Sequence, residues 1–444
     1  MSGRAMPVRF PPHPRGAAPA EPGPLTMFGW MTNAMRVPEL RRRVLFTAMI
    51  LAVYRFGSWL PAPGVDSNAV GSFLNSKGTS IFGLLNLLSG SSLSRLSLFA
   101  LGIVPYVTAS IVVQLLTAVV PRFEQLQKEG EAGYAKLNQY TRYATVALAA
   151  AQATGYTYLF RQEGALQLNF GRFVIVVVTL TAGMALLMWL GEQITKRGVG
   201  NGISILIFAS ILASAPTGIR AWLNGSATEQ LFFPIAALLV LVAVVFVQEG
   251  QRKIPIQYAR RMVGRRVTGG ASTYMPLRVN MAGVIPVIFA AALLALPPTL
   301  AGFVPSTTQF INRYVQPGTF TYLGGEALLI VAFTFVYTAV QFNPLDQAGN
   351  LRKHGGYIPG IRPGRPSADY LDRVLTRLTL AGALFLAAVA VTPCIFIHQA
   401  GFSQATSRAL GGTSVLIVVG VALDTMRQME AQMMTRRYEG FLRR

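Results

Sequence analysis

Residues 80–120 read SIFGLLNLLSGSSLSRLSLFALGIVPYVTASIVVQLLTAVV, and the two parts of this stretch differ in character. The second part, residues 98–120, is almost wholly apolar and is long enough for a helix that crosses a bilayer, which takes about 20 residues. The first part, residues 80–97, mixes leucines with serines, glycines, an asparagine and Arg95. Those polar groups cannot be satisfied against lipid, so this part is expected to fold back beside protein or a water-filled space.

The composition indicates that the whole chain belongs in a membrane. Of its 444 residues, 52% are hydrophobic and only 13% are charged, and the mean hydropathy is +0.45. Soluble proteins carry about 25% charged residues, so the sequence predicts a polytopic membrane protein. Its single cysteine, Cys394, excludes an intrachain disulfide.

Ten stretches are apolar enough to be membrane spans. They lie at residues 44–62, 98–120, 143–160, 173–191, 202–216, 233–249, 281–298, 326–343, 378–397 and 412–428. Two are weak, because the first contains Arg55 and the fifth is short. Arg55 is the one ionisable residue well inside a span, and it either pairs with a partner or extends toward the interface.

The formal net charge of +22 reports the orientation of the chain. Ten spans place both termini on one side, and most of the 39 Lys and Arg residues fall on that side. Positive residues stay in the cytoplasm, so both termini are predicted to be cytoplasmic. Two loops on this side, 250–279 and 345–377, are longer than connections need to be, and they mix basic residues with Tyr, Ile and Pro. We expect them to fold partly and to dock a partner, although a solvated basic loop that only fixes the orientation is the simpler alternative.

Chemistry-bearing side chains are scarce. The three histidines are His13, His354 and His398, in or near loops, and no metal-binding or catalytic motif surrounds them. The GVGNG at 198–202 lacks the spacing of a nucleotide-binding fingerprint and is interpreted as a tight turn before the fifth span. We therefore expect no enzyme activity, no catalytic residue, no cofactor and no metal site.

Several long strings resemble the bacterial SecY family, the protein-conducting channel of the general secretion pathway. They are ALGIVPYVTASIVVQLL (100–116), NQYTRYATVALA (138–149), LMWLGEQIT (187–195), RGVGNGISI (197–205), VGRRV (263–267), LRVNMAGVIPVIFA (277–290), YTAVQFNP (337–344), YIPGIRPGRPSADYLDRVLTRLTL (357–380) and GGTSVLIVVGVALD (411–424). The likeness runs from about residue 34 to the C-terminus. Residues 1–33 have no counterpart in the family pattern and are expected to be a disordered, Pro-rich tail.

The resemblance implies an all-α polytopic membrane protein in the bacterial plasma membrane. Ten helices would form two pseudosymmetric, inverted five-helix halves, at 34–216 and 217–444, hinged between the fifth and sixth spans and open on one side. Residues 80–97 would then be a plug that caps the pore from outside, although a plain re-entrant or interfacial segment would have a similar composition. Such a segment would need few apolar contacts if it is to be displaced easily. The plug residues are Ile81, Phe82, Leu84, Leu85, Leu88 and Arg95.

The resemblance also assigns a pore ring and a lateral gate. The ring residues are Ile103, Val107, Ile203, Ile207, Ile288 and Ile417, although any one of them alone would be read as ordinary packing or a lipid contact. The gate residues are Thr108, Gln114 and Asn280. A hydrogen bond between Gln114 and Asn280 would close the gate with a net contribution of roughly 0.6–2 kcal/mol, although either amide could instead cap a helix end.

Arg265, Arg266 and Arg362 match the positions at which the family docks the motor ATPase SecA and the ribosome. Arginine suits this role because its guanidinium binds phosphate groups such as those of ribosomal RNA. Other implied partners are the small membrane subunits SecE and SecG, unfolded preproteins with their signal peptides, and membrane lipid. The implied function is translocation of unfolded preproteins across the plasma membrane, with lateral release of transmembrane segments into lipid. Two alternatives stay open. A secondary solute transporter would need a polar midplane site, and a receptor or scaffold would need no plug.

Overall fold

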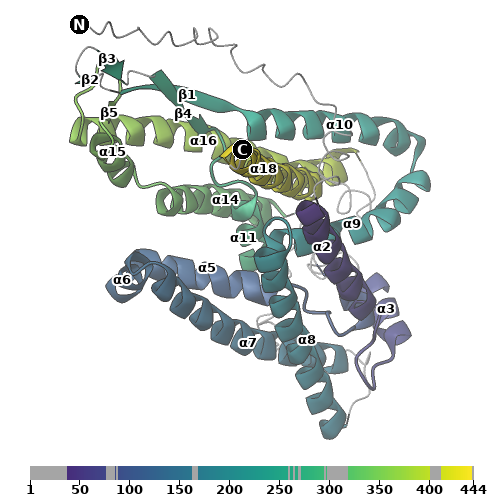
Figure 1. Cartoon of the computed structure of the whole chain (residues 1–444). Coiled ribbons are helices and arrows are strands. Elements are labelled where there is room, and N and C mark those ends of the chain that lie inside the picture. The colour runs from purple at the N-terminus through teal and green to yellow at the C-terminus, as the bar shows by residue number, and fades with distance from the viewer. Residues whose placement is uncertain are drawn as a thin grey trace, which may run out of the picture.

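The computed structural model describes residues 38–76, 86, 89–162, 169–258, 261–263, 266–268, 272–294, 297, 319–400 and 412–442 (Figure 1). A helix lies at each of the ten predicted spans. By length and composition, five of the described helices could cross a membrane, or six if the bent pair at 104–128 is one span. Several predicted residues lie outside the described ones: residues 1–33 and Ile81, Phe82, Leu84, Leu85, Leu88 and Arg265.

The first five span helices form one packed group. They are α2 (Pro38–Gly57), α5 (Val104–Val119), α7 (Glu131–Gln162), α8 (Phe170–Arg197) and α9 (Gly202–Leu223). Helix α7 lies between α5 and α8, and α8 in turn contacts α9 and α2. A two-point ion pair joins Arg142 of α7 to Glu192 near the C-terminal end of α8.

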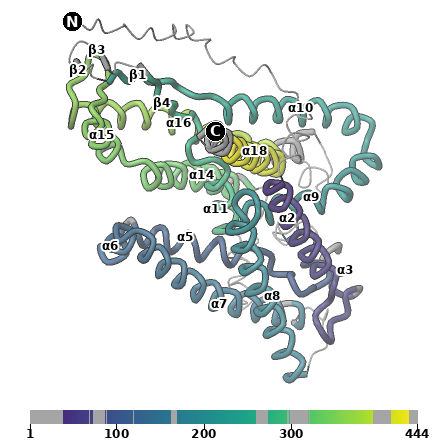
Figure 2. Tube along the Cα trace, in the orientation of Figure 1, coloured from purple at the N-terminus to yellow at the C-terminus, as the bar shows by residue number. Residues whose placement is uncertain are grey.

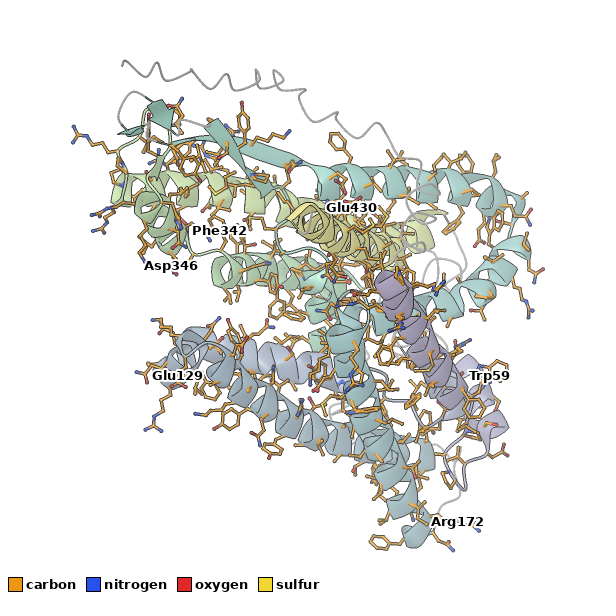
Figure 3. All side chains as sticks on the ribbon, viewed as in Figure 1. Trp59, Glu129, Arg172, Phe342, Asp346 and Glu430 are labelled. Atoms are coloured by element: carbon orange, nitrogen blue, oxygen red, sulfur yellow. The ribbon has the colours of Figure 1, made fainter. Side chains whose placement is uncertain are left out.

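The last five span helices form a second group. They are α10 (Ala227–Glu249), α11 (Ile285–Leu294), α14 (Phe320–Gln341), α16 (Arg365–Ala400) and α18 (Gly412–Leu442). Helix α14 packs along α16 and α11, while α18 packs against α10 and α16. The two groups meet where α11 contacts α5 and α18 contacts α9. Figure 2 shows them diverging from there toward the ends that carry the short helices α6 (Pro121–Lys128) and α15 (Pro344–Lys353). In Figure 3, Glu129 and Asp346 mark these two tips.

The connection between the two groups is only three residues, Asn224–Ser226, and the Ser226 side chain caps α10 by accepting from the Glu229 amide. The predicted boundary at 216/217 therefore falls inside α9. Pro216 did not end this helix, although it has no amide hydrogen to donate. The fifth span is correspondingly longer than expected.

The GVGNG segment is the predicted tight turn. Gly200 has φ of +77°, a conformation that favours glycine. The Thr47 hydroxyl of α2 accepts from the Val199 amide at 3.1 Å, and the Thr195 hydroxyl accepts from the Gly202 amide at 2.9 Å. Asn201 caps α9. The turn therefore fixes where α9 begins, one residue before the predicted ring residue Ile203.

The two long basic loops fold together, as their composition predicted in part. The first forms a hairpin of β1 (Gln251–Tyr258) and β4 (Ser272–Arg278), and the second supplies β5 (Gly356–Tyr357), which pairs antiparallel with β1. A smaller ribbon, β2 (Arg261–Val263) with β3 (Arg266–Thr268), extends the hairpin. The buried cluster Ile254, Leu277, Ile358, Leu371 and Leu375 packs the sheet onto α16.

The span beginning at 98 starts as turns, and α5 itself begins at Val104, with Pro105 in its first turn. Gly102 has φ of +59°, and the 3-10 turn η1 (Leu93–Arg95) lies upstream. Because residues 98–103 form turns, Ile103 lies directly before the first residue of α5 and not inside the helix. A short helix α3 (Ser67–Ser76) packs beside η1.

Candidate pore, gate and plug base

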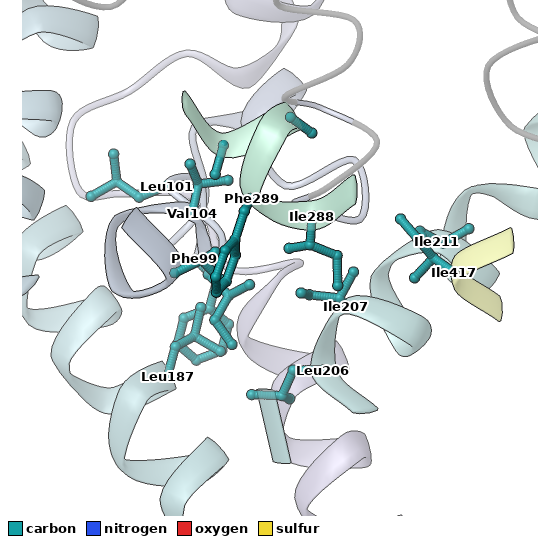
Figure 4. Close-up of a cluster of buried hydrophobic side chains, with 14 of the residues drawn as sticks. Phe99, Leu101, Val104, Leu187, Leu206, Ile207, Ile211, Ile288, Phe289 and Ile417 are labelled. Atoms are coloured by element: carbon teal, nitrogen blue, oxygen red, sulfur yellow. The ribbon is translucent and has the colours of Figure 1, made fainter. Parts of the chain in front are cut away.

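The predicted ring residues come together in one apolar cluster. Ile103, Val107, Ile207, Ile288 and Ile417 are buried, and Ile203 is half-buried against them. They come from α5 and the turn before it, from α9, from α11 and from α18, so both helix groups contribute. Figure 4 shows Ile288 of α11 above Ile207 of α9, with Ile417 beside Ile211. All six are aliphatic, and their side chains offer no hydrogen-bonding group.

A seam lies between α5 and the pair α11–α14. Phe289 of α11 contacts Phe333 and Tyr337 of α14 edge-on, with ring centroids 5.9 and 6.5 Å apart. These three rings and Gln114 of α5 line one narrow crevice. Thr108 is buried and donates to the Val104 carbonyl at 3.0 Å. Gln114 therefore lies at the predicted gate, opposite aromatic side chains.

The predicted hydrogen bond between the two gate amides is not formed. The Gln114 amide donates to the Ser110 hydroxyl at 3.5 Å, and the Asn280 amide donates to the Gly283 carbonyl at 2.9 Å. The Asn280 Oδ1 atom is buried and has no hydrogen-bond partner. Asn280 thus braces the turn that leads into α11, which is the local role that the sequence left open.

A polar cavity of about 400 Å³ lies where α9, α10, α11 and α18 meet the sheet. Arg427 of α18 donates to the Gln248 carbonyl at 2.9 Å and to the Glu249 carboxylate at 2.7 Å. The Asp424 carboxylate lies 3.7 Å from Arg427 and 4.0 Å from Arg278 at the end of β4. Partial burial, with the positive charge of Arg427, lowers the pKa of the Arg278 guanidinium. This charge cluster joins three elements that are distant in sequence.

The sequence analysis missed this cluster. Asp424 and Arg427 stand three residues apart on one helix, a spacing that places them on one face, and this was the only local signal. Their partners, Glu249 and Arg278, lie about 150 residues or more earlier in the chain, so only the fold brings them near.

The described part of the plug segment, residues 89–97, is firmly held. Leu93 and Leu96 are completely buried, so the expectation of few apolar contacts does not describe this part, because η1 within the segment packs against α3. The Arg95 guanidinium lies 4.6 Å from the centre of the Trp59 ring. Arg55 donates to the Gly90 carbonyl at 3.1 Å, which confirms that this intramembrane arginine pairs.

The described docking residues lie at the sheet end of the molecule. Arg266 is in β3, and Arg362 is exposed in the turn before α16. The Ser367 hydroxyl donates to the Arg362 carbonyl at 2.9 Å, so the backbone of this residue braces the turn while its side chain faces outward. Within the described ranges, no group of three or more His, Cys, Asp or Glu residues is arranged to hold a metal ion.

Long apolar helices in two groups that meet at a shared apolar core define a polytopic membrane protein. Residues 97–426 match the SecY family model, and the chain belongs to the SecY family. As a member it is a channel subunit and not an enzyme.

Relatives from bacteria support the assignment over nearly the whole chain. A protein translocase subunit SecY of Mycobacterium bovis is 45% identical over 442 residues, covering 94% of this chain and 100% of the relative. Another, from Halalkalibacterium halodurans, is 48% identical over 435 residues with the same coverage of both chains.

Solved structures show the same fold. A structure described as that of a protein conducting channel has a TM-score of 0.62 at 19% identity, covering 88% of this chain and 92% of its own. A second, of a SecY protein whose plug domain stabilises the closed channel, has a TM-score of 0.59 at 19% identity and covers 90% and 96%. The canine Sec61 channel in its ribosome complex has a TM-score of 0.57 at 17% identity, with 90% and 96% covered.

Proposed function

We propose that the chain forms the channel through which unfolded preproteins cross the bacterial plasma membrane, and that apolar segments leave it sideways into lipid. The observation that carries the proposal is that six aliphatic residues from both helix groups, which we assign to the pore ring, lie in one apolar cluster. Aliphatic side chains bind no particular sequence, because they offer no hydrogen bonds. When the ring is narrow it resists ion flow by excluding water.

The seam supports sideways release. The aromatic pairs of Phe289 with Phe333 and Tyr337 stay within the α11–α14 side. The Gln114 hydrogen bond to Ser110 stays within α5. Between the two sides lies a narrow, mainly apolar crevice. A hydrophobic signal segment could therefore enter between α5 and α14 without breaking any of these contacts. We assign Gln114, Thr108 and Asn280 to this gate.

The orientation and partners follow from the charge. Lys and Arg residues outnumber Asp and Glu by 39 to 17, and the sheet carries many of them, so we place the sheet and both termini in the cytoplasm. Channels of the same fold solved with ribosomes support a ribosome as one partner. We propose that it docks on the sheet and that the motor ATPase SecA is a second partner there. SecE and SecG are the membrane subunits that we expect beside the helices.

A crosslinking experiment tests the channel. In a Cys394→Ser background, Ile288→Cys is expected to form a disulfide with a single cysteine in a preprotein stalled in membranes with SecA and ATP. The adduct should appear only when the preprotein cysteine reaches the depth of the ring. The matched control is Leu239→Cys on α10, whose side chain is 68% exposed on the outer face and should give no adduct. Failure to crosslink at both Ile288 and Ile103 in active membranes would refute the proposal.

A charge substitution tests the docking surface. Arg362→Glu is expected to weaken ribosome binding to proteoliposomes by about tenfold at low salt, because one charge-assisted contact to phosphate is lost. The difference should shrink as salt rises, since counterion release is reduced. Arg122→Glu on α6, also exposed and outside both docking loops, is the control for a general charge effect. Equal losses for the two variants would show that only net charge matters, and that Arg362 is no docking residue.

A further inference from the structure

Three buried polar atoms surround the polar cavity where α9, α10, α11 and α18 meet the sheet. They are Nε2 of Gln248, Oδ1 of Asn280 and Nη1 of Arg427, and none of them has a hydrogen-bond partner among the described residues. Gln248 and Asn280 are each only 3% exposed, so bulk water does not replace the missing partners. In Figure 3, Glu430 marks this part of α18. Leaving a buried polar atom unpaired is costly, so three of them around one cavity require an explanation.

The contacts that these residues do make fix what each of them can offer. The Asn280 Nδ2 group donates to the Gly283 carbonyl at 2.9 Å, which leaves Oδ1 as a free acceptor. Arg427 uses Nη2 for both of its hydrogen bonds to α10. Its Nη1 group lies 3.7 Å from the Asp424 carboxylate, which is too far for a hydrogen bond. The wall of the cavity therefore holds one unpaired acceptor and unpaired donors.

The cavity lies on the sheet side of the predicted pore ring. Ile285 and Val421 line it. Ile285 comes three residues before Ile288 of the ring, and Val421 comes four residues after Ile417, about one helical turn in each case. A polypeptide that reaches the ring from the sheet would therefore pass this wall first. The side chains of the ring offer it no hydrogen bond, whereas the wall holds donors and an acceptor.

The unpaired groups match the chemistry of a polypeptide main chain. Each residue of an extended chain, other than proline, carries one N–H donor and one C=O acceptor. A small anion would pair with the donors and leave the Asn280 acceptor unpaired, and a cation would pair with the acceptor alone. A main chain pairs in the same way whatever its side chains are, so a site for it would not select particular sequences.

Resting on the proposed channel function, we propose that Gln248, Asn280 and Arg427 form a main-chain site, which binds the backbone of the translocating polypeptide just before the ring. Asn280 lies in the turn that leads into α11, and Arg427 lies on α18. Both helices carry ring residues, so widening of the ring would shift these side chains and open their unpaired atoms to the cavity. The site then holds a chain in transit and slows its return to the cytoplasm.

Gln248→Met tests the site, because methionine keeps the length of the side chain and removes only its amide. A preprotein is stalled partway into proteoliposomes of the complete translocase by removal of ATP, and loss of protease protection measures its backward sliding. We expect sliding about fivefold faster, the factor that corresponds to one hydrogen bond. The midpoint of thermal unfolding in detergent should stay unchanged or rise, since the lost Nε2 group had no partner. A lower midpoint would mean that Gln248 acts on stability, and would overturn its role in the site.

Gln152→Met on α7 is the matched control. Both amide atoms of Gln152 are buried without a partner in the described part of the chain, and the residue is 5% exposed. It lines neither the polar cavity nor the crevice at the seam. This variant should resemble Gln248→Met in unfolding and the unaltered chain in sliding. Normal sliding in Gln248→Met would refute the site, and so would faster sliding that both variants share.

The sequence of the stalled preprotein separates main-chain binding from side-chain binding. Tracts of alternating Gly and Ser, of Ala, or of alternating Gly and Asp are placed at the depth of the cavity. The effect of Gln248→Met should be the same for all three, and an effect confined to the Asp tract would show that the cavity binds carboxylates instead. A tract of prolines, which has no N–H groups, should slide back faster than the Ala tract in the unaltered channel. Equal rates for these two tracts would also refute main-chain binding.

The Ile288 crosslink distinguishes this proposal from the channel itself. A normal adduct in the unaltered chain, together with sliding that neither Gln248→Met nor the proline tract changes, refutes the main-chain site alone. Absence of the adduct in active membranes, at both Ile288 and Ile103, refutes the channel.

Discussion

Gly183→Ala is expected to prevent most of the chain from accumulating in the membrane. Gly183 lies in the middle of α8, and an alanine Cβ there would be 1.9 Å from the Leu98 carbonyl oxygen. That atom belongs to the backbone, so no side-chain rotation relieves the clash. Either α8 or the turn that precedes α5 must move by more than 1 Å, which costs about 3 kcal/mol or more. Protein level in isolated membranes and the midpoint of thermal unfolding in detergent measure the effect.

The same helix offers a matched control. Gly171, at the start of α8, has no atom within 4 Å of a built Cβ, and Gly171→Ala is expected to leave accumulation and unfolding unchanged or slightly improved, because alanine has the higher helix propensity. If the two variants behaved alike, the close approach of residue 98 to α8 would be wrong. That approach would then no longer account for the position of Ile103, the predicted ring residue five residues further on.

Arg427→Gln is expected to cause the second large loss. Arg427 supplies a donor to the Gln248 carbonyl at the last turn of α10 and a charge to Glu249. A cation in this place stabilises a helix C-terminus. The side chain is only 21% exposed, so solvent screens these contacts incompletely, and their loss should cost about 2 kcal/mol. Thermal unfolding in detergent should show the loss, and translocation should slow with it.

A double-mutant cycle separates the contacts of Arg427. Asp424→Asn alone removes the carboxylate between Arg427 and Arg278, and its effect should be smaller, because both distances are long. The effects of the two substitutions should not add, since they share one interaction. Arg427→Lys keeps the charge but not the two-point geometry and should fall between. Full additivity would show that the charge cluster is not one unit.

Much of the fold could be predicted from the sequence, because hydrophobic length is a local property. Each of the ten stretches became a helix, including the weak first span with Arg55. The predicted bounds of two spans were wrong. The fifth span was expected to end at residue 216, but the helix continues to Leu223. The turns at 98–103 were read as helix, since their apolar side chains resemble those of the helix that follows.

The candidate site was predictable only where a resemblance supplied it. Periodicity alone could not distinguish Ile207 from any other buried isoleucine. The pairing of Tyr54 with Ser210, 156 residues apart, leaves no trace in local sequence. The third strand, which the second basic loop adds to the hairpin of the first loop, leaves no such trace either. Those contacts depend on how helices cross, which the pattern of spans does not specify.

The three-stranded sheet has a mechanical consequence. Strand β1 follows α10 with no intervening loop, β4 ends seven residues before α11, and β5 lies between α15 and α16. Backbone pairing of Gln257 with Tyr357 ties together segments that are one hundred residues apart. A force applied anywhere on the sheet is therefore divided among several helices at once. A docked partner that pulls on the sheet would therefore shift these helices together, including α11 with its residue Ile288.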